Sequence, residues 1–225
     1  MKIDHLQLQR PSTHAGSLFV AVHLDKRAVI SSTLLSVGAS LLKQGAAAPH
    51  KVTVDFEVEN HTKWSLSTPI AHLKYGVLME PPVPVLPGTK EGFKARKTSF
   101  SLAGSYGTVS WEVTPGWRAV AMWCVPWTHF FGISNELAVG IVVNDGHYGN
   151  LAAAMRKDNT GYEDASPYRH HVYSTSSKSI QYCNSDFCVQ GIMGTSLNCH
   201  VKLSVVPKQT KDLAHSLQEH LGLLG

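Results

Sequence analysis

From Lys51 onward, the chain consists of short runs in which apolar and polar residues alternate, and this pattern restricts the fold more than any other feature. The run at 51–58 alternates at period two, as a strand with one buried face should. Further strands are expected at 70–78, 93–102, 108–113, 118–125, 137–143, 179–193 with a bend near 184–186, and 199–206. Proline and glycine turns separate these runs. Many short strands with frequent turns predict a β-sandwich and argue against alternating β-α units.

Residues 28–44, ahead of the strands, have the periodicity of an amphipathic helix. Its apolar face consists of Ile30, Leu34, Leu35, Val37, Leu41 and Leu42. The opposite face is rich in hydroxyl groups and nearly uncharged, so the helix either rests on the body of the protein or lies in a membrane interface. A helix of this length would cover about 25 Å, close to the hydrocarbon thickness of a bilayer.

Two shorter helices are expected later in the chain. Asn150 is suited to cap a helix through Met155. Near the end, Leu213, Leu217 and Leu221 form a narrow apolar stripe that docks on the sandwich or on a neighbouring chain, or frays. The predicted fold is therefore mainly β: a compact sandwich flanked by an N-terminal amphipathic helix and a short second helix, with a C-terminal helical extension. The expected domains are an N-terminal extension or pro-region at 1–27, one domain at 28–206 with its sandwich at 50–206, and the extension at 207–225.

Residues 124–135, which we name the aromatic loop, are unusually apolar for a loop. Pro126 and Gly132 interrupt any strand or helix there. Between and beside them lie Trp127, Phe130, Phe131 and Ile133. Because large apolar side chains on a loop are unfavourable in water, they either fold beneath the domain or bury themselves in another molecule. Tryptophan suits a membrane interface, since its ring has an apolar body and a polar edge.

The composition is that of a globular protein that does not span a membrane or bind nucleic acid. Hydrophobic residues make up 43% of the 225 residues and charged residues 16%, and no apolar run approaches the ~20 residues of a membrane-spanning helix. The net charge of +4 mildly favours anionic surfaces, but the basic residues are scattered. The four cysteines have no zinc-ligand spacing, and their redox state is left open.

No pattern of catalytic or metal-binding residues is present. The adjacent His170 and His171 would point to opposite sides of a strand, and no spaced acidic or histidine cluster joins them. The sequence also lacks a nucleophile elbow and a phosphate-binding glycine loop. We therefore expect no enzyme, no metal and no cofactor.

An amphipathic helix, a sandwich and an aromatic loop, in this order, resemble the actinoporins, the pore-forming cytolysins typified by sea-anemone toxins. The similarity covers about 28–206. Its most specific part is the run Cys124-Val125-Pro126-Trp127, which leads into the aromatic loop and closes on Ser134-Asn135. Lys26-Arg27 matches the dibasic end of the pro-region in the family's precursors.

The resemblance implies a secreted, soluble protein, stored in a nematocyst if the source is a cnidarian, that acts at a target-cell membrane. Its partner would be a membrane lipid with a phosphocholine headgroup, such as sphingomyelin. The protein would then associate with copies of itself and insert the N-terminal helix to form a cation-permeable pore.

The family's headgroup-binding positions carry over residue by residue. They correspond here to Lys74, Tyr75, Val109, Cys124, Pro126, Trp127, Phe130, Phe131, Ile133 and Tyr162. Several differ in chemistry, because Lys74 replaces an arginine, Cys124 a serine and Ile133 a tyrosine. Another lipid or a glycan therefore stays open as the target, and a non-lytic lectin-like or lipid-binding module is the alternative function.

Overall fold

The computed structural model describes residues 51–130, 132–157, 167–175 and 177–223. The predicted extension at 1–27, the helix at 28–44 and two of the predicted site residues, Phe131 and Tyr162, lie outside the described residues.

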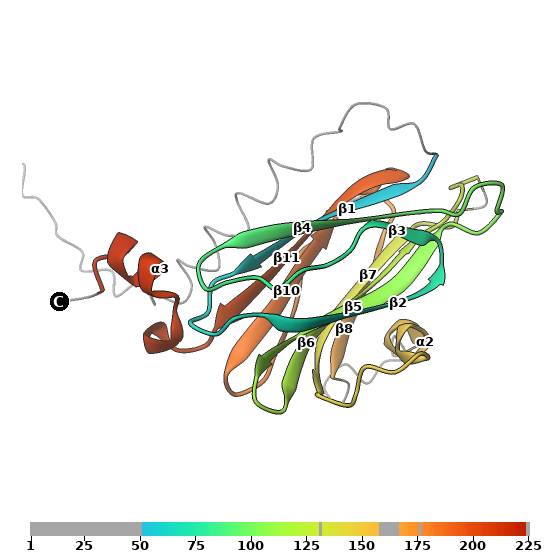
Figure 1. The fold of residues 1–225 in the computed structure, drawn as a ribbon. Helices are drawn as coiled ribbons and strands as arrows, with labels where there is room; N and C mark the ends of the chain where they lie inside the picture. The colour runs from blue at the N-terminus through green and yellow to red at the C-terminus, as the bar shows by residue number, and fades with distance from the viewer. Residues whose placement is uncertain (1–50, 131, 158–166, 176, 224–225) are drawn as a thin grey trace, which may run out of the picture.

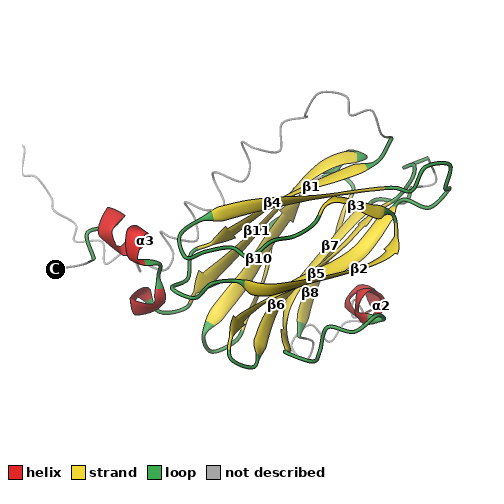
Figure 2. Ribbon diagram, viewed as in Figure 1, coloured by secondary structure: helices red, strands yellow, loops and turns green. Residues whose placement is uncertain are grey.

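Two β-sheets pack face to face, as the alternating pattern predicts (Figures 1 and 2). The strands are β1 (Thr53–Asn60), β2 (Ser67–Tyr75), β3 (Val77–Glu80), β4 (Lys90–Arg96), β5 (Ser105–Thr114), β6 (Trp117–Val125), β7 (Asn135–Val143), β8 (Tyr168–Tyr173), β9 (Ile180–Cys183), β10 (Phe187–Met193) and β11 (Asn198–Pro207). One sheet has the order β3-β4-β1-β11-β10-β9 and the other β2-β5-β6-β7-β8. Among the described strands, β1 and β11 pair in parallel and the other pairs are antiparallel. The β-sandwich prediction is confirmed.

The main core lies between the sheets. Alternate residues of β1 point into it, and Phe56 stacks on Phe93 of the neighbouring strand with ring centroids 4.0 Å apart. Trp123, fully buried on the facing sheet, meets the edge of Phe56 at 5.1 Å. Burying these large rings supplies much of the apolar area that stabilises the sandwich.

A short helix, α2 (Leu151–Lys157), covers part of the outer face of the five-stranded sheet (Figure 1). Leu151 and Met155 are fully buried against Met122 and Ala138. This confirms the helix predicted after Asn150, whose backbone carbonyl accepts hydrogen bonds from the amides of Ala153 and Ala154.

The C-terminal segment docks on the sandwich. It contains a 3-10 turn, η1 (Thr210–Asp212), and the helix α3 (His215–His220). Leu213, only 1% exposed, forms a β-bridge with Thr62. Lys63 Nζ lies 2.7 Å from Asp212 Oδ1. Of the three outcomes left open for this segment, docking on the protein's own sandwich is found at Leu213, whereas Leu221, at the other end of the predicted stripe, is 46% exposed.

Two strand predictions were wrong in their details, and one strand was missed. The run at 70–78 forms two strands, because at Gly76, where φ is +97°, the chain leaves β2 of one sheet and enters β3 of the other. A Cβ atom at Gly76 would lie 2.5 Å from the carbonyl oxygen of Arg96, so the crossing also requires a residue without a side chain. The run at 93–102 ends as a strand at Arg96, and β8 was not predicted.

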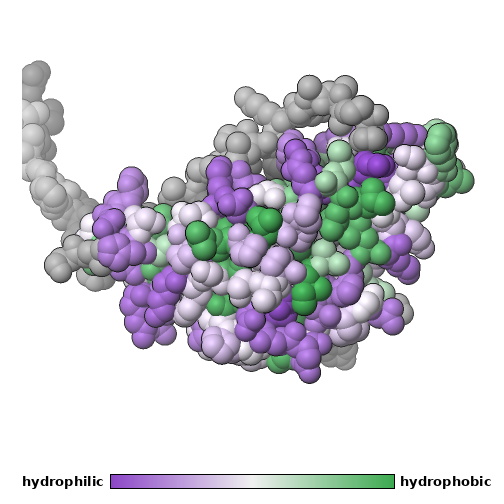
Figure 3. Space-filling view, in the orientation of Figure 1, coloured by the Kyte–Doolittle hydropathy of each residue, from purple (hydrophilic) through white to green (hydrophobic). Residues whose placement is uncertain are grey.

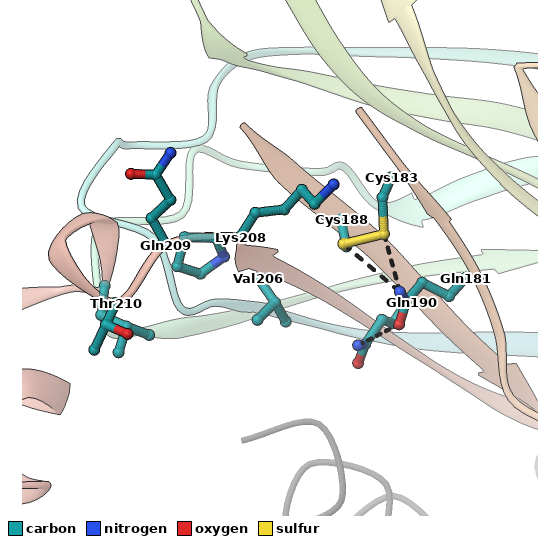
Figure 4. A pocket seen from close by; sticks show the side chains of 10 residues that line it. Gln181, Cys183, Cys188, Gln190, Val206, Lys208, Gln209 and Thr210 are labelled. Carbon is teal, nitrogen blue, oxygen red and sulfur yellow. Dashed lines mark hydrogen bonds between the residues drawn. A yellow bond between two sulfur atoms is a disulfide. The ribbon is translucent and has the colours of Figure 1, made fainter. Parts of the chain in front are cut away.

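The redox state of the cysteines, left open by the sequence, is now defined. Cys183 and Cys188 form a disulfide between β9 and β10, whereas Cys124 and Cys199 are free thiols. A hollow of about 210 Å³ lies beside this disulfide, and its lining side chains are drawn in Figure 4. Within it, Gln190 Nε2 donates to Gln181 Oε1 at 2.8 Å. Lys208 and Thr210, just after β11, also line it, so the hollow belongs to the α3 end of the sandwich.

Candidate functional site

The aromatic loop connects β6 to β7 at the end of the sandwich opposite α3 (Figure 1). Phe130 is 85% exposed and Ile133 45% exposed, while Trp127 is half-buried and Pro126 is buried. The sequence left two alternatives for the apolar side chains of this loop, folding beneath the domain or burial in another molecule, and they apply to different parts of the loop. Its base folds against the domain, and its tip presents apolar side chains to solvent.

The base of the loop is fixed to the facing sheet. Asn135 is fully buried, and its side-chain amide donates to the carbonyls of Gly194 and Ser196, both at 2.8 Å, in the turn between β10 and β11. Nε2 of the His129 ring lies 3.1 Å from the side-chain oxygen Oδ1 of Asn135. Lys51 Nζ sits 4.7 Å from the ring centroid of Trp127. These contacts hold the tip on a rigid support.

A row of four side chains crosses the outer face of the five-stranded sheet next to the loop. Tyr75 pairs with Tyr106, Tyr106 with Cys124, and Cys124 with Glu136. Tyr75 is 47% exposed, and its ring centroid is 6.4 Å from that of the buried Tyr106. Burial raises the pKa of the Cys124 thiol to about 11, so this cysteine is protonated at neutral pH.

The protein's own cations already contact the rings of this row. Arg156 of α2 makes a two-point ion pair with Glu136 at 2.6 and 2.7 Å, and its guanidinium lies 6.0 Å from the Tyr106 ring centroid. Lys74 Nζ lies 5.8 Å from the ring of Tyr75. Burial alone would raise the pKa of Glu136, but the hydrogen bonds from His170 and Arg156 outweigh it and lower that pKa. A quaternary ammonium ligand would have to compete with these cations for the ring faces.

The structure thus divides the predicted headgroup residues into three groups. Lys74, Tyr75 and Cys124 lie in or beside the row across the sheet. Trp127, Phe130 and Ile133 lie on the aromatic loop, where Pro126 is buried in its base. The side chain of Val109 is completely buried in the main core and reaches neither group.

Sequence reasoning missed Tyr106, Glu136 and Arg156. Nothing in their spacing indicates a site, because strand register and the packing of α2 bring them together. Among the helices of the described part of the chain, none has the length and apolar character needed to cross a membrane.

Comparison with known proteins finds relatives whose similarity extends over most of the chain. Conoporin-Cn1 of Conus consors is 30% identical, with 89% of this chain and 84% of the relative covered. Echotoxin-2 of Monoplex parthenopeus is 32% identical, with 96% and 82% covered. Tereporin-Ca1 of Terebra anilis is 40% identical over a shorter part, 47% of this chain and 56% of its own length. No protein-family model matches.

Among solved structures, the lipid-binding protein Nakanori has a similar fold. The TM-score is 0.55 at 15% sequence identity, covering 81% of this chain and 80% of that one. At this identity the likeness concerns the fold alone.

Proposed function

Because this chain belongs to the actinoporin-like family of molluscan toxins, as its similarity to the conoporin and the echotoxin shows, we propose that it is a pore-forming toxin that binds lipid through the aromatic loop. The relatives come from molluscs, so the sea-anemone type expected from the sequence is not supported, and neither is storage in a nematocyst. In this proposal the protein is secreted, acts without enzymatic chemistry and works at a target-cell membrane.

The observation that carries the proposal is the exposed apolar tip on a fixed base. Phe130 is 85% exposed although its loop is held by the buried Asn135. Moving such a side chain from water into a bilayer interface is favourable, and little conformational entropy is lost because the base is already ordered. A rigid apolar tip is therefore suited to a first contact with lipid.

The headgroup would lie next to the tip, at the exposed part of the row. Tyr75 offers a half-exposed ring to a choline group, and Lys74 offers a positive charge to the phosphate of the same lipid. On these two contacts we propose a lipid with a phosphocholine headgroup, such as sphingomyelin, as the partner. Tyr106 contributes less, since Arg156 lies over its ring.

Pore formation would follow membrane binding. We assign it to self-association and to insertion of the helix predicted at 28–44, whose hydroxyl-rich face could line a water-filled, cation-permeable pore without buried charge. The apolar face of that helix would then contact lipid, and its backbone hydrogen bonds would be satisfied internally.

The test measures vesicle binding and dye release with the same protein preparations. Vesicles of phosphatidylcholine with and without sphingomyelin are mixed with the intact chain, with Phe130→Ser and with a chain lacking 28–44. We expect Phe130→Ser to weaken binding by about tenfold to thirtyfold, the equivalent of roughly 1.5–2 kcal/mol of lost apolar transfer. The shortened chain should bind vesicles and release no dye.

Leu86→Ser is the matched control for these measurements. Leu86 is 61% exposed, but it lies two residues before Gly88, which packs against Ala214 beside α3 at the other end of the sandwich. Its loss should leave binding unchanged. Dye release by the chain lacking 28–44 would contradict the role of the helix, and an intact chain that binds none of these vesicles would contradict the proposal.

One observation favours a second function, a lipid-binding module that does not lyse membranes. Contact of Phe130 and Tyr75 with lipid needs only side-chain surface that is already exposed, whereas lysis needs a further insertion step. Vesicle binding by the intact chain with no dye release at any protein concentration would support this alternative.

A further inference from the structure

A second apolar loop lies beside the aromatic loop. It is the β4–β5 loop (residues 97–104), which follows β4 where the sequence had predicted continued strand. Phe100 is fully exposed, at 104% of its reference area, and Leu102 is 75% exposed. Within the described part of the chain, Phe100 is the most exposed of the large apolar side chains, ahead of Phe130.

The two loops are neighbours because their strands pair at this end of the sheet. Ser105, where β5 begins, is in register with Val125, where β6 ends. A Cβ atom at Gly104 would lie 1.8 Å from the carbonyl oxygen of Val125, so the two backbones are in contact there. Apolar surface gathers at this end of the molecule in the space-filling view, at the upper right of Figure 3.

The β4–β5 loop is built to hold its tip outward. Lys97 Nζ donates to the carbonyls of Ser101 at 2.7 Å and Thr98 at 3.2 Å, and the amide of Ser101 donates to the Thr98 carbonyl. The backbone of Phe100 has φ of +61°, a left-handed conformation that is unfavourable for a bulky residue. Such strain persists where surrounding contacts impose it, and it is found most often at functional positions.

The charges around the tip fit a lipid surface. Arg96, Lys97 and Lys51 lie at the base of the two loops, where the amide of Lys97 donates to the carbonyl of Val52, the residue before β1. No Asp or Glu occurs between Glu91 and Glu112, or within the aromatic loop. An apolar tip with three cations at its base matches a bilayer, in which apolar chains lie beneath anionic phosphates.

We propose that the β4–β5 loop is a second membrane-inserting element, with Phe100 and Leu102 entering the bilayer beside Phe130. The three cations then lie at the level of the lipid phosphates. This inference rests on the proposed function, because it extends the same membrane contact to a loop that the family resemblance does not include.

The experiment measures partition onto vesicles of phosphatidylcholine and sphingomyelin by sedimentation. Phe100→Ser should lower the partition coefficient by about tenfold or more, and Leu102→Ser by somewhat less because it is less exposed. In the double variant Phe100→Ser with Phe130→Ser, the partition coefficient should fall by roughly the product of the two single-variant factors, since both side chains would enter the same bilayer independently. Leu86→Ser is again the control.

The outcomes separate this inference from the proposed function. Suppose that the intact chain binds vesicles, that Phe130→Ser binds them more weakly, and that Phe100→Ser and Leu102→Ser bind them like the intact chain. The second membrane-inserting element is then refuted and the proposed function stands. If the intact chain does not bind vesicles at all, both are refuted.

A second measurement keeps the test independent of variant stability. In Phe100→Trp, the added indole should be quenched by lipids brominated on their acyl chains, beyond the quenching seen for the intact chain. Equal quenching in the two proteins would overturn the inference. The exposed tip of the β4–β5 loop could instead be covered by a second copy of the chain, and sedimentation in lipid-free buffer tests this. If the intact chain is a dimer in that buffer and Phe100→Ser is a monomer, the inference is also overturned.

Discussion

Lowering the pH from about 7.5 to about 5 should destabilise this protein by protonating one buried histidine. His147 is 8% exposed and lies on the outer face of the five-stranded sheet. Its Nδ1 contacts the hydroxyl of Ser110, and its Nε2 lies 2.9 Å from the hydroxyl of Thr108. Ser110 also accepts a hydrogen bond from Arg118 Nε at 2.9 Å, so its own proton is available to Nδ1. This network fits a neutral ring that is protonated at Nε2.

The pKa of His147 is correspondingly lowered, from 6.5 to about 4, by burial first and then by the charges of His72 and Arg118. Between these two values the unfolded chain binds a proton that the folded chain does not, so stability is complete above about pH 6.5 and falls as the pH drops toward 4. With these pKa values, the loss between pH 7.5 and pH 5 comes to about 2 kcal/mol.

Urea unfolding followed by tryptophan fluorescence at the two pH values measures this loss. His147→Gln keeps polar atoms near Ser110 and Thr108 but does not titrate, so it should lose most of the pH dependence, whatever its stability at pH 7.5. The carboxylates with lowered pKa, Glu59 and Glu136, titrate below this window and affect both proteins alike. An equal drop in unfolding free energy for the intact chain and His147→Gln would refute the reasoning.

Two further predictions concern the row beside the loop and the core. Arg156→Ala removes both guanidinium hydrogen bonds from the buried Glu136 and leaves it the contact with His170, so urea unfolding at neutral pH should show a loss of about 1–2 kcal/mol. No loss would mean that the ion pair is dispensable. Gly191→Ala places a Cβ 2.8 Å from Val139 Cγ1 in the facing sheet. This contact should lower the free energy of unfolding by about 1–3 kcal/mol and the melting temperature by several degrees. An unchanged melting temperature would show that the sheets can separate freely there.

The alternating pattern was sufficient to predict a sandwich because each strand of such a fold exposes one face and buries the other. It failed where burial is not one-sided. β8, Tyr168–Tyr173, is the edge strand of its sheet, and most of its side chains are half-buried, so no alternation marks it. The run at 70–78 alternates continuously, although Gly76 divides it between two sheets, because the pattern records burial and not the sheet in which a residue is buried.

The candidate site was predictable only in its local part. Trp127, Phe130 and Ile133 are close in sequence, so a loop rich in large apolar residues is visible without coordinates, but its division into a buried base and an exposed tip is not. The exposed Phe100 was assigned to a strand, because an apolar residue in an alternating run is read as buried.

The amino-acid sequence by itself determined most of the strands, the helix after Asn150 and which loop is rich in aromatic residues, since these depend on neighbours a few positions apart. Only the tertiary structure decided that Tyr75, Tyr106, Cys124 and Glu136 form one row and that the β4–β5 loop lies beside the aromatic loop. Those arrangements depend on strand register and on backbone contacts between residues far apart in the chain, which no local pattern encodes.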